Sequence, residues 1–350
     1  MRSLKDVDLK GKKVVVRVGF DLPVENGVII DDTRLRASLP TLDYILKQDP
    51  EAVVLINHFG RPDGRRVEDL SNKIIAKKLK EVSGTDVVMI NNLQELKRLI
   101  SSKHTSGAFF LLENIRFWYQ EEANEEKFAN SIGTLFDVYI NDAFSVSHRA
   151  HASFVGIPKF TSEKCMGLLF EKEFTNLSRV KDDPRHPAVM AIGGAKIATK
   201  LPVIENMIKI YDHILVGGLI ANEIIDEKIS LGEKVILPVD YSPNAKAKLR
   251  IDIGPKTVEN FIKYIKEAET IIWNGPMGKY EIEESAMGTK KIQEAITENK
   301  EAIQVVGGGE TLDAIKQFGS FDDFDYVSMS GGAMLKFLAG KELPGITALE

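Results

Sequence analysis

Short apolar runs alternate with amphipathic stretches along nearly the whole chain, and this alternation restricts the fold more than any other feature. The runs are typical of buried strands, and the stretches between them carry apolar residues at the three- and four-residue spacing of helices. Strands that alternate with helices form βαβ units with parallel strands. The sequence therefore predicts an α/β fold of doubly wound, Rossmann-like parallel sheets. The expected strands are 13–18, 52–57, 86–90, 108–114 and 138–141, then 188–192, 213–216, 270–273, 302–306 and 326–329.

The chain is long enough for more than one hydrophobic core. Single cores stop growing near ~250–300 residues, and this chain has 350. We therefore expect two domains, 1–162 and 182–334. The stretch between them, EKCMGLLFEKEFTNLSRVK (163–181), is interpreted as one helix that connects the domains.

Composition excludes several classes of protein. The formal charge is -5 and Lys and Arg are spread along the chain, which argues against nucleic-acid binding. A single cysteine, Cys165, excludes an internal disulfide, and the N-terminus lacks the apolar core of a signal peptide. No apolar run reaches the ~18 residues that a membrane span needs. These features predict a soluble, cytoplasmic protein with no membrane partner.

The loops after the expected strands differ between the two halves, and in parallel sheets these loops bind ligands. In the second half they are GGAK, GGL, NGPMG, GGGET and SGGAM. Such glycine-rich loops let backbone N–H groups and helix N-termini approach phosphates, which indicates a nucleotide. The chain has no GxxxxGK[ST] loop, which excludes a P-loop kinase, and no GxGxxG motif opening a helix, which removes the main support for a dehydrogenase.

In the first half the corresponding loops are rich in cations: NHFGRP (57–62), ENIRF (113–117) and SHRAHAS (147–153), with Arg34 near a helix start. They indicate a small anionic substrate. A nucleotide half and an anion half joined by a helix are typical of a kinase that closes to exclude water. Phosphoryl transfer needs this because its catalysis is mostly positioning and charge neutralisation.

Individual residues allow a functional and a structural interpretation. Lys196 and Lys200 are four residues apart at an expected helix start, so their side chains share one face of the helix. In the functional interpretation they contact a phosphate, and in the structural interpretation they are simply solvated. Glu310 and Thr311 follow GGG at another expected helix start. The Glu310 carboxylate either caps the helix or contributes to binding magnesium and phosphate. His148 and His151 lack the partners of a metal site. The candidate anion ligands, matching roughly three to four negative charges, are Arg34, His58, Arg61, Arg116 and Arg149.

Longer motifs carry a family resemblance. The chain contains, in this order, NHFGRP, LLENIRF, YINDAFSVSHRAHAS, GGAKIATKLPVIENM, IDIGPKTVENF, TIIWNGPMG, VVGGGET and GKELPGITAL. Together they resemble the phosphoglycerate kinase family. The resemblance implies two α/β domains, a hinge helix and a tail (335–350) that packs back onto the first domain. It also implies a monomer that transfers a phosphoryl group between 1,3-bisphosphoglycerate and ADP, giving 3-phosphoglycerate and ATP with Mg²⁺.

The resemblance also implies residue roles. Arg34, His58, Arg61, Arg116 and Arg149 would hold the phosphoglycerate, with Phe59 and Gly60 in the same loop. Lys196 and Lys200 would contact the nucleotide phosphates and the moving group, and Glu281 the ribose. The expected phosphate and magnesium loop is Gly308, Gly309, Glu310 and Thr311. Transfer would be direct and in line, with Arg34, Lys196 and Lys200 as the catalytic cations.

The chain departs from the family pattern at several positions. Gly19 and Asp21 stand where the family carries Asp and Asn, and we expect Asp21 to take over a hydrogen bond to the substrate hydroxyl. Glu310 replaces an Asp, and Met329 and Ser330 alter the last glycine turn. The segment Ala221–Arg250 is short for the family. Two alternatives to an active kinase therefore remain open: a binding protein that has lost turnover, and a kinase for another small carboxylate.

Overall fold

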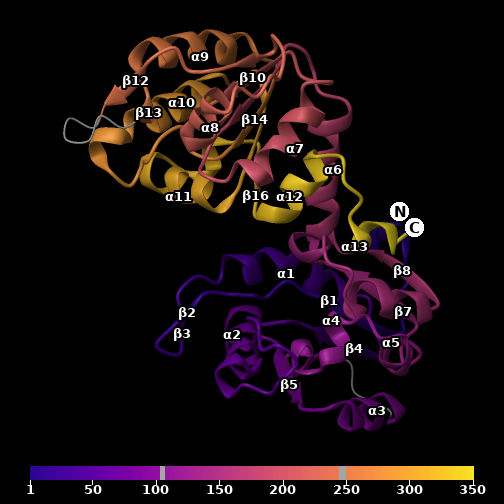
Figure 1. Cartoon of the computed structure of the whole chain (residues 1–350). Coiled ribbons are helices and arrows are strands. Elements are labelled where there is room, and N and C mark those ends of the chain that lie inside the picture. Colours follow the sequence, from indigo (N-terminus) through magenta and orange to yellow (C-terminus); the bar gives the residue numbers. More distant parts are fainter. Residues whose placement is uncertain (103–106, 244–249) are drawn as a thin grey trace. The chain divides into compact units, whose positions relative to one another are not determined.

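The computed structural model describes residues 1–102, 107–243 and 250–350. It divides into two compact units, unit 1 (Met1–Phe174 with Glu342–Glu350) and unit 2 (Thr175–Lys341) (Figure 1). The boundary falls inside helix α6 (Leu168–Asp182). Among the described residues, no helix combines the length and apolarity that a membrane crossing requires.

Unit 1 is built on a six-stranded sheet in the order β5-β6-β4-β1-β7-β8, with every neighbouring pair parallel. Alternate residues of β1, such as Val14 and Val16, point into a core shared with Leu35 and Leu42 of α1 and Ile75 of α2. The strands are β1 (Lys13–Arg17), β4 (Ala52–Ile56), β5 (Asp86–Ile90), β6 (Ala108–Leu112), β7 (Val138–Asn141) and β8 (Glu163–Met166), with the hairpin β2 (Val24–Glu25) and β3 (Val28–Ile29). The helices are α1 (Thr33–Leu46), α2 (Lys73–Ser83), α3 (Leu93–Ser101), α4 (Tyr119–Glu122), α5 (Glu126–Gly133) and α13 (Pro344–Thr347).

Unit 2 repeats the architecture, with parallel strands in the order β11-β10-β9-β14-β15-β16. Val189, Ile271 and Trp273 of its strands pack against α9 and α10 through Phe261 and Ile292. The strands are β9 (Ala188–Ile192), β10 (His213–Val216), β11 (Val235–Ile236), β14 (Thr270–Asn274), β15 (Ile303–Gly307) and β16 (Tyr326–Ser328), with the pair β12 (Tyr241–Pro243) and β13 (Arg250–Ile253). The helices are α7 (Ile197–Met207), α8 (Gly218–Asp226), α9 (Pro255–Glu267), α10 (Met287–Glu298), α11 (Gly309–Phe318) and α12 (Gly331–Leu338).

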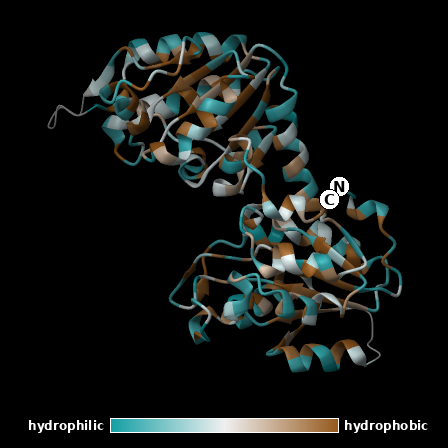
Figure 2. Cartoon of the chain, turned by 45° about the vertical axis from the view of Figure 1, so that its right-hand side comes forward, coloured by the Kyte–Doolittle hydropathy of each residue, from teal (hydrophilic) through white to brown (hydrophobic). Residues whose placement is uncertain are grey.

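The predicted fold class is confirmed: each unit has a parallel sheet with helices, and its strands follow the expected ranges closely. Figure 2 shows the hydrophobic residues concentrated on the strands inside each unit. This burial explains why the strands appear as nearly continuous apolar runs in the sequence.

Two boundaries differ from the expected ones. The expected helix 163–181 begins only at Leu168, because Glu163–Met166 form strand β8 beside β7. The expected tail 335–350 is shorter, because α12 continues to Leu338 and its carbonyl accepts a hydrogen bond from Asn206 Nδ2 at 2.7 Å within unit 2. From Glu342 the chain belongs to unit 1, where Gly345 N donates to Ser147 O at 2.8 Å.

Candidate functional site

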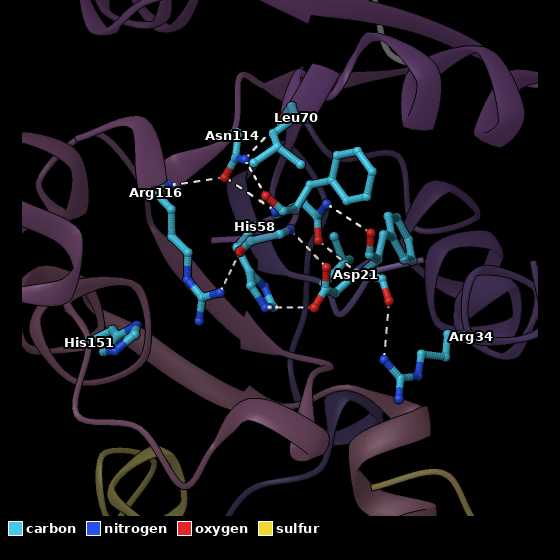
Figure 3. A network of polar contacts seen from close by, with 12 residues as sticks. Asp21, Arg34, His58, Leu70, Asn114, Arg116 and His151 are labelled. Carbon is cyan, nitrogen blue, oxygen red and sulfur yellow. Dashed lines mark hydrogen bonds and ion pairs between the residues drawn. The ribbon is translucent and has the colours of Figure 1, made fainter. Parts of the chain in front are cut away.

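A polar cluster gathers at the carboxyl ends of β1 and β4 in unit 1 (Figure 3). Asp21 Oδ1 accepts a hydrogen bond from Gly60 N at 2.9 Å, and Asp21 Oδ2 lies 3.7 Å from His58 Nε2. Arg34, the second residue of α1, donates to the carbonyl oxygen of Asp21 at 3.1 Å. The structure therefore brings Asp21, Arg34, His58 and Gly60 together, as the sequence predicted.

Arg116 and Asn114 hold the loop that carries Phe59 and Gly60. Arg116 is buried, donates to Gly60 O at 2.8 Å and pairs with Glu122 at 3.2 Å. Asn114 Nδ2 donates to Phe59 O at 2.6 Å, and Asn114 Oδ1 accepts from Phe59 N at 3.2 Å. Gly60 has a φ of +62°, which favours glycine. These contacts fix the shape of the loop.

Arg17 is a member of this cluster that sequence reasoning missed. It is the last residue of β1 and is 1 % exposed. Its NH2 group lies 2.9 Å from His58 Nδ1, its Nε donates to Ser153 Oγ at 2.9 Å, and its guanidinium lies 4.3 Å from the centre of the Phe154 ring. A charged residue inside the apolar run VVVRV was the signal for it, because a buried charge requires partners.

Burial and positive neighbours set the electrostatics of this cluster. Burial, followed by the charges of Arg17 and Arg116, lowers the pKa of His58 well below its ordinary value. Burial likewise lowers the pKa of His151 to about 4. His58 is therefore neutral at neutral pH. Arg149 is half-buried and adds to the positive field at His58, whereas Arg61 is exposed directly after Gly60.

Unit 2 contains a hollow of about 200 Å³ at the carboxyl ends of β9, β14, β15 and β16. The starts of α7, α11 and α12 meet around it, so the free N–H groups and positive dipole ends of these helices suit an anion. Gly331 and Gly332 line it from α12. It also brings together most of the residues predicted for the nucleotide, namely Lys196, Lys200, Gly308, Gly309, Glu310 and Thr311.

The two predicted lysines have different environments. Lys200 is 8 % exposed, and its Nζ donates a hydrogen bond to Asn274 Oδ1. Burial lowers the pKa of Lys200 to about 8, partly opposed by the charge of Glu310. Lys196 is exposed at the N-cap of α7, one residue before the helix begins. They line one hollow, but only Lys200 is on the helix. Sequence reasoning missed Asn274, although a polar residue ends the apolar run TIIW.

Backbone geometry explains why glycines surround this hollow. Gly308 has a φ of +105°, and an added Cβ would lie 2.9 Å from Asn274 Nδ2. Gly275 has a φ of +94°, and its N–H donates to Thr311 Oγ1 at 2.6 Å. Side chains at these positions would strain the turns and displace Asn274 or its neighbours.

Glu310 is the carboxylate on the lining of this hollow, in the first turn of α11. Magnesium is commonly held by one or two carboxylates together with substrate phosphates. In the described part of the chain, no group of three or more His, Cys, Asp or Glu could hold a metal by itself. A single carboxylate beside a phosphate-sized hollow fits this mode of binding. Glu281 is exposed and is not part of the lining.

The structure shows the surroundings of several departures from the family pattern, and nothing in it explains the glycine at position 19. An added Cβ at Gly19 would lie 3.5 Å from Ala143 Cβ and Ser145 Oγ, which is ordinary contact. Ser330 is the N-cap residue of α12, and its N–H donates to Ser328 Oγ at 3.3 Å, directly after Met329. Of the short segment 221–250, residues 244–249 lie outside the described residues.

Comparisons with known proteins agree with these observations. The family model for phosphoglycerate kinase matches residues 4–240 and 232–341. The phosphoglycerate kinase of Dictyoglomus turgidum is 40% identical over 99% of this chain and 98% of its own length. The phosphoglycerate kinase of Thermosipho africanus is 38% identical over 99% of this chain and 97% of its own length. The solved structure of phosphoglycerate kinase from Coxiella burnetii covers 99% of this chain and 98% of that chain, with a TM-score of 0.90 and 32% identity. The crystal structure of phosphoglycerate kinase from Pyrococcus horikoshii covers 100% of this chain and 98% of that chain, with a TM-score of 0.83 and 30% identity. The chain belongs to the phosphoglycerate kinase family.

Proposed function

We propose that this chain is an active phosphoglycerate kinase that transfers a phosphoryl group reversibly between 1,3-bisphosphoglycerate and ADP. The observation that carries the proposal is Lys200, a buried cation in a hollow formed at three helix N-termini. A buried ammonium is costly unless an anion arrives to share its field. A nucleotide phosphate supplies that charge.

In unit 1, the phosphoglycerate is held by Arg34, His58, Arg61, Arg116 and Arg149, and its anionic groups occupy the positive field that also lowers the pKa of His58. The loop at Phe59 and Gly60 forms part of the binding surface. Asp21 accepts the hydrogen bond of the substrate hydroxyl through Oδ2, since its Oδ1 already accepts from Gly60 N. The phosphoglycerate domain corresponds to unit 1 with its C-terminal segment, and the nucleotide domain to unit 2.

In unit 2, Lys196 and Lys200 bind the nucleotide phosphates, with the loop Gly308, Gly309, Glu310 and Thr311. Glu310 is the protein ligand of Mg²⁺, which when bound neutralises phosphate charge, and Glu281 contacts the ribose. The phosphoryl group passes directly in line, with no phosphoenzyme. Arg34, Lys196 and Lys200 stabilise the transferring group, so loss of Arg34 or Lys196 is expected to lower turnover by about 10²–10³.

A coupled assay with 3-phosphoglycerate and ATP tests the function. Turnover that depends on both substrates and on Mg²⁺ is the expected result. If activity does not exceed background while calorimetry still detects nucleotide binding, the chain is instead a binding protein that has lost turnover. Activity only with another small carboxylate in a substrate panel would assign a different kinase.

The same proposal includes a cytoplasmic monomer. It is supported by the single cysteine of the chain, Cys165, which is buried and leaves no pair for an internal disulfide, and by membership of the phosphoglycerate kinase family. Light scattering during gel filtration tests the monomer: a mass near 38.9 kDa is expected, and twice that mass would contradict it.

A further inference from the structure

The contact between Arg17 and His58 restricts the protonation of the His58 ring. A guanidinium has only donors, so the NH2 group of Arg17, 2.9 Å from His58 Nδ1, requires Nδ1 to be an acceptor. A neutral imidazole that accepts at Nδ1 carries its proton on Nε2. That Nε2 faces Asp21 Oδ2 across 3.7 Å, on the side where Arg34 also lies (Figure 3). The proton of His58 therefore points toward the polar cluster.

Arg17 is itself held by a buried network behind the site. Its Nε donates to Ser153 Oγ at 2.9 Å, and Ser153 Oγ and N donate to the two carboxylate oxygens of Glu121 at 2.5 Å and 2.8 Å. Glu121 is fully buried and compensates the charge of Arg17. The guanidinium also stacks on Phe154, 4.3 Å from the ring centre. These contacts come from strand β1, helix α4 and the segment after β7, so Arg17 cannot easily turn away.

The charges around His58 keep it neutral, which makes the tautomer the relevant variable. Arg17, Arg116 and Arg149 disfavour the imidazolium, as does His151, while Asp21 is the carboxylate that faces it. Without Arg17, the contact that still favours a proton on Nε2 is Asp21 Oδ2, which at 3.7 Å lies beyond hydrogen-bond distance and acts only weakly.

We propose that Arg17 is a positioning residue that holds His58 as the neutral Nε2–H tautomer, so that His58 donates one hydrogen bond from Nε2 to an oxygen of the phosphoglycerate. Arg17 acts through His58 and does not touch the substrate. The substrate part of this inference rests on the proposed function, whereas the tautomer is a property of the free protein.

The tautomer is measured first, by long-range ¹H–¹⁵N spectra of the full chain labelled at histidine, with His58 assigned through His58→Gln. The wild type should show His58 as a single neutral Nε2–H tautomer from about pH 6 to pH 8. An Nδ1–H tautomer or an imidazolium in this range would overturn the proposal without any variant.

The variant Arg17→Met should convert the His58 signals to a mixture of tautomers. Because this change leaves Glu121 buried without its cation, the double variant Arg17→Met/Glu121→Gln provides a charge-balanced second background. The matched control is Arg66→Met, which removes another arginine of unit 1 that pairs with Glu113 at 3.5 Å and does not contact His58. An unchanged Nε2–H tautomer in either folded Arg17 variant would contradict the inference.

Kinetics distinguishes positioning from general stabilisation. With a hydrogen bond to substrate lost, KM for 3-phosphoglycerate should rise about tenfold in the Arg17 variants, while KM for ATP stays unchanged. A fall in kcat with both KM values unchanged indicates only less folded enzyme and would contradict the role. If the wild type shows no turnover, the proposed function fails, but the tautomer result still decides the role of Arg17.

Discussion

The two units bury a cation in different ways. In unit 1, Arg17 is joined to Ser153 and His58 and compensated by Glu121, and burial lowers its pKa only to about 10. In unit 2, Lys200 donates to the neutral Asn274, and burial lowers its pKa to about 8. A guanidinium with a pKa of about 10 stays charged at neutral pH, whereas an ammonium with a pKa of about 8 loses its charge as the pH rises through that value. Arg17 is therefore charge-compensated within the fold, whereas the hollow around Lys200 is stabilised by an incoming anion.

The largest expected effect tests Lys200, the buried cation of unit 2. Lys200→Met should lower turnover by about 10²–10³, because it removes a preorganised charge from the phosphate hollow. The same substitution at exposed Lys209 is the control and should leave turnover unchanged. Steady-state assays of purified, folded variants measure both. Near-full turnover of Lys200→Met at saturating nucleotide would remove Lys200 from the mechanism.

The second prediction compares how the units shape their loops. Gly275→Ala should destabilise the protein by about 2–4 kcal/mol, since its φ is +94° and the new Cβ would lie 2.3 Å from Gly193 O. Gly19→Ala in unit 1 is the control, with contacts no closer than 3.5 Å and little expected change. Denaturant unfolding measures both. Equal stabilities would mean that the backbone around Gly275 relaxes freely.

The third prediction concerns Asp21, the exposed end of the unit 1 network. Asp21→Ala should raise KM for 3-phosphoglycerate by about tenfold and leave KM for ATP unchanged, because a substrate hydroxyl loses its acceptor. Gly19→Asp, whose Cβ would make only ordinary contacts, should bring little gain and weaken binding through repulsion of the anion. If Asp21→Ala is neutral, the hydroxyl contact lies elsewhere.

The smallest effect is a pH dependence specific to unit 2. Lysine is cationic below its pKa, so with a pKa of about 8 the free enzyme loses the Lys200 charge as pH rises through that value. The kcat/KM for nucleotide should fall about threefold from half a unit below to half a unit above this pKa. Lys200→Arg should flatten this limb if it retains activity. An unchanged limb in that variant would assign the titration to another group.

The strands and the candidate ligand-binding loops of this protein can be predicted from the local sequence. The apolar runs predict the parallel strands, and the positions of glycines and cations after them predict which loops bind ligands. Most of the predicted residues do gather: Asp21, Arg34, His58 and Gly60 form one cluster, and Lys200 lines one hollow with Glu310. This works because parallel strands bring their carboxyl ends to the same edge of a sheet.

Other features depend on contacts between segments far apart in the chain. The two-residue period of a strand places Arg17 on the face opposite Val16, but only the folded chain brings Glu121 and Ser153 there to compensate it. Likewise, helical spacing does not distinguish Lys196 from Lys200, but in the folded chain Lys200 is buried and donates to Asn274 of strand β14, whereas Lys196 is exposed. The stretch Glu163–Met166 forms a strand because its backbone pairs in parallel with the edge of β7. The sequence by itself determined the strands, the loops and the kinds of side chain at the site. Tertiary structure decided which charges are buried and paired, because desolvation and partners depend on what packs against each group.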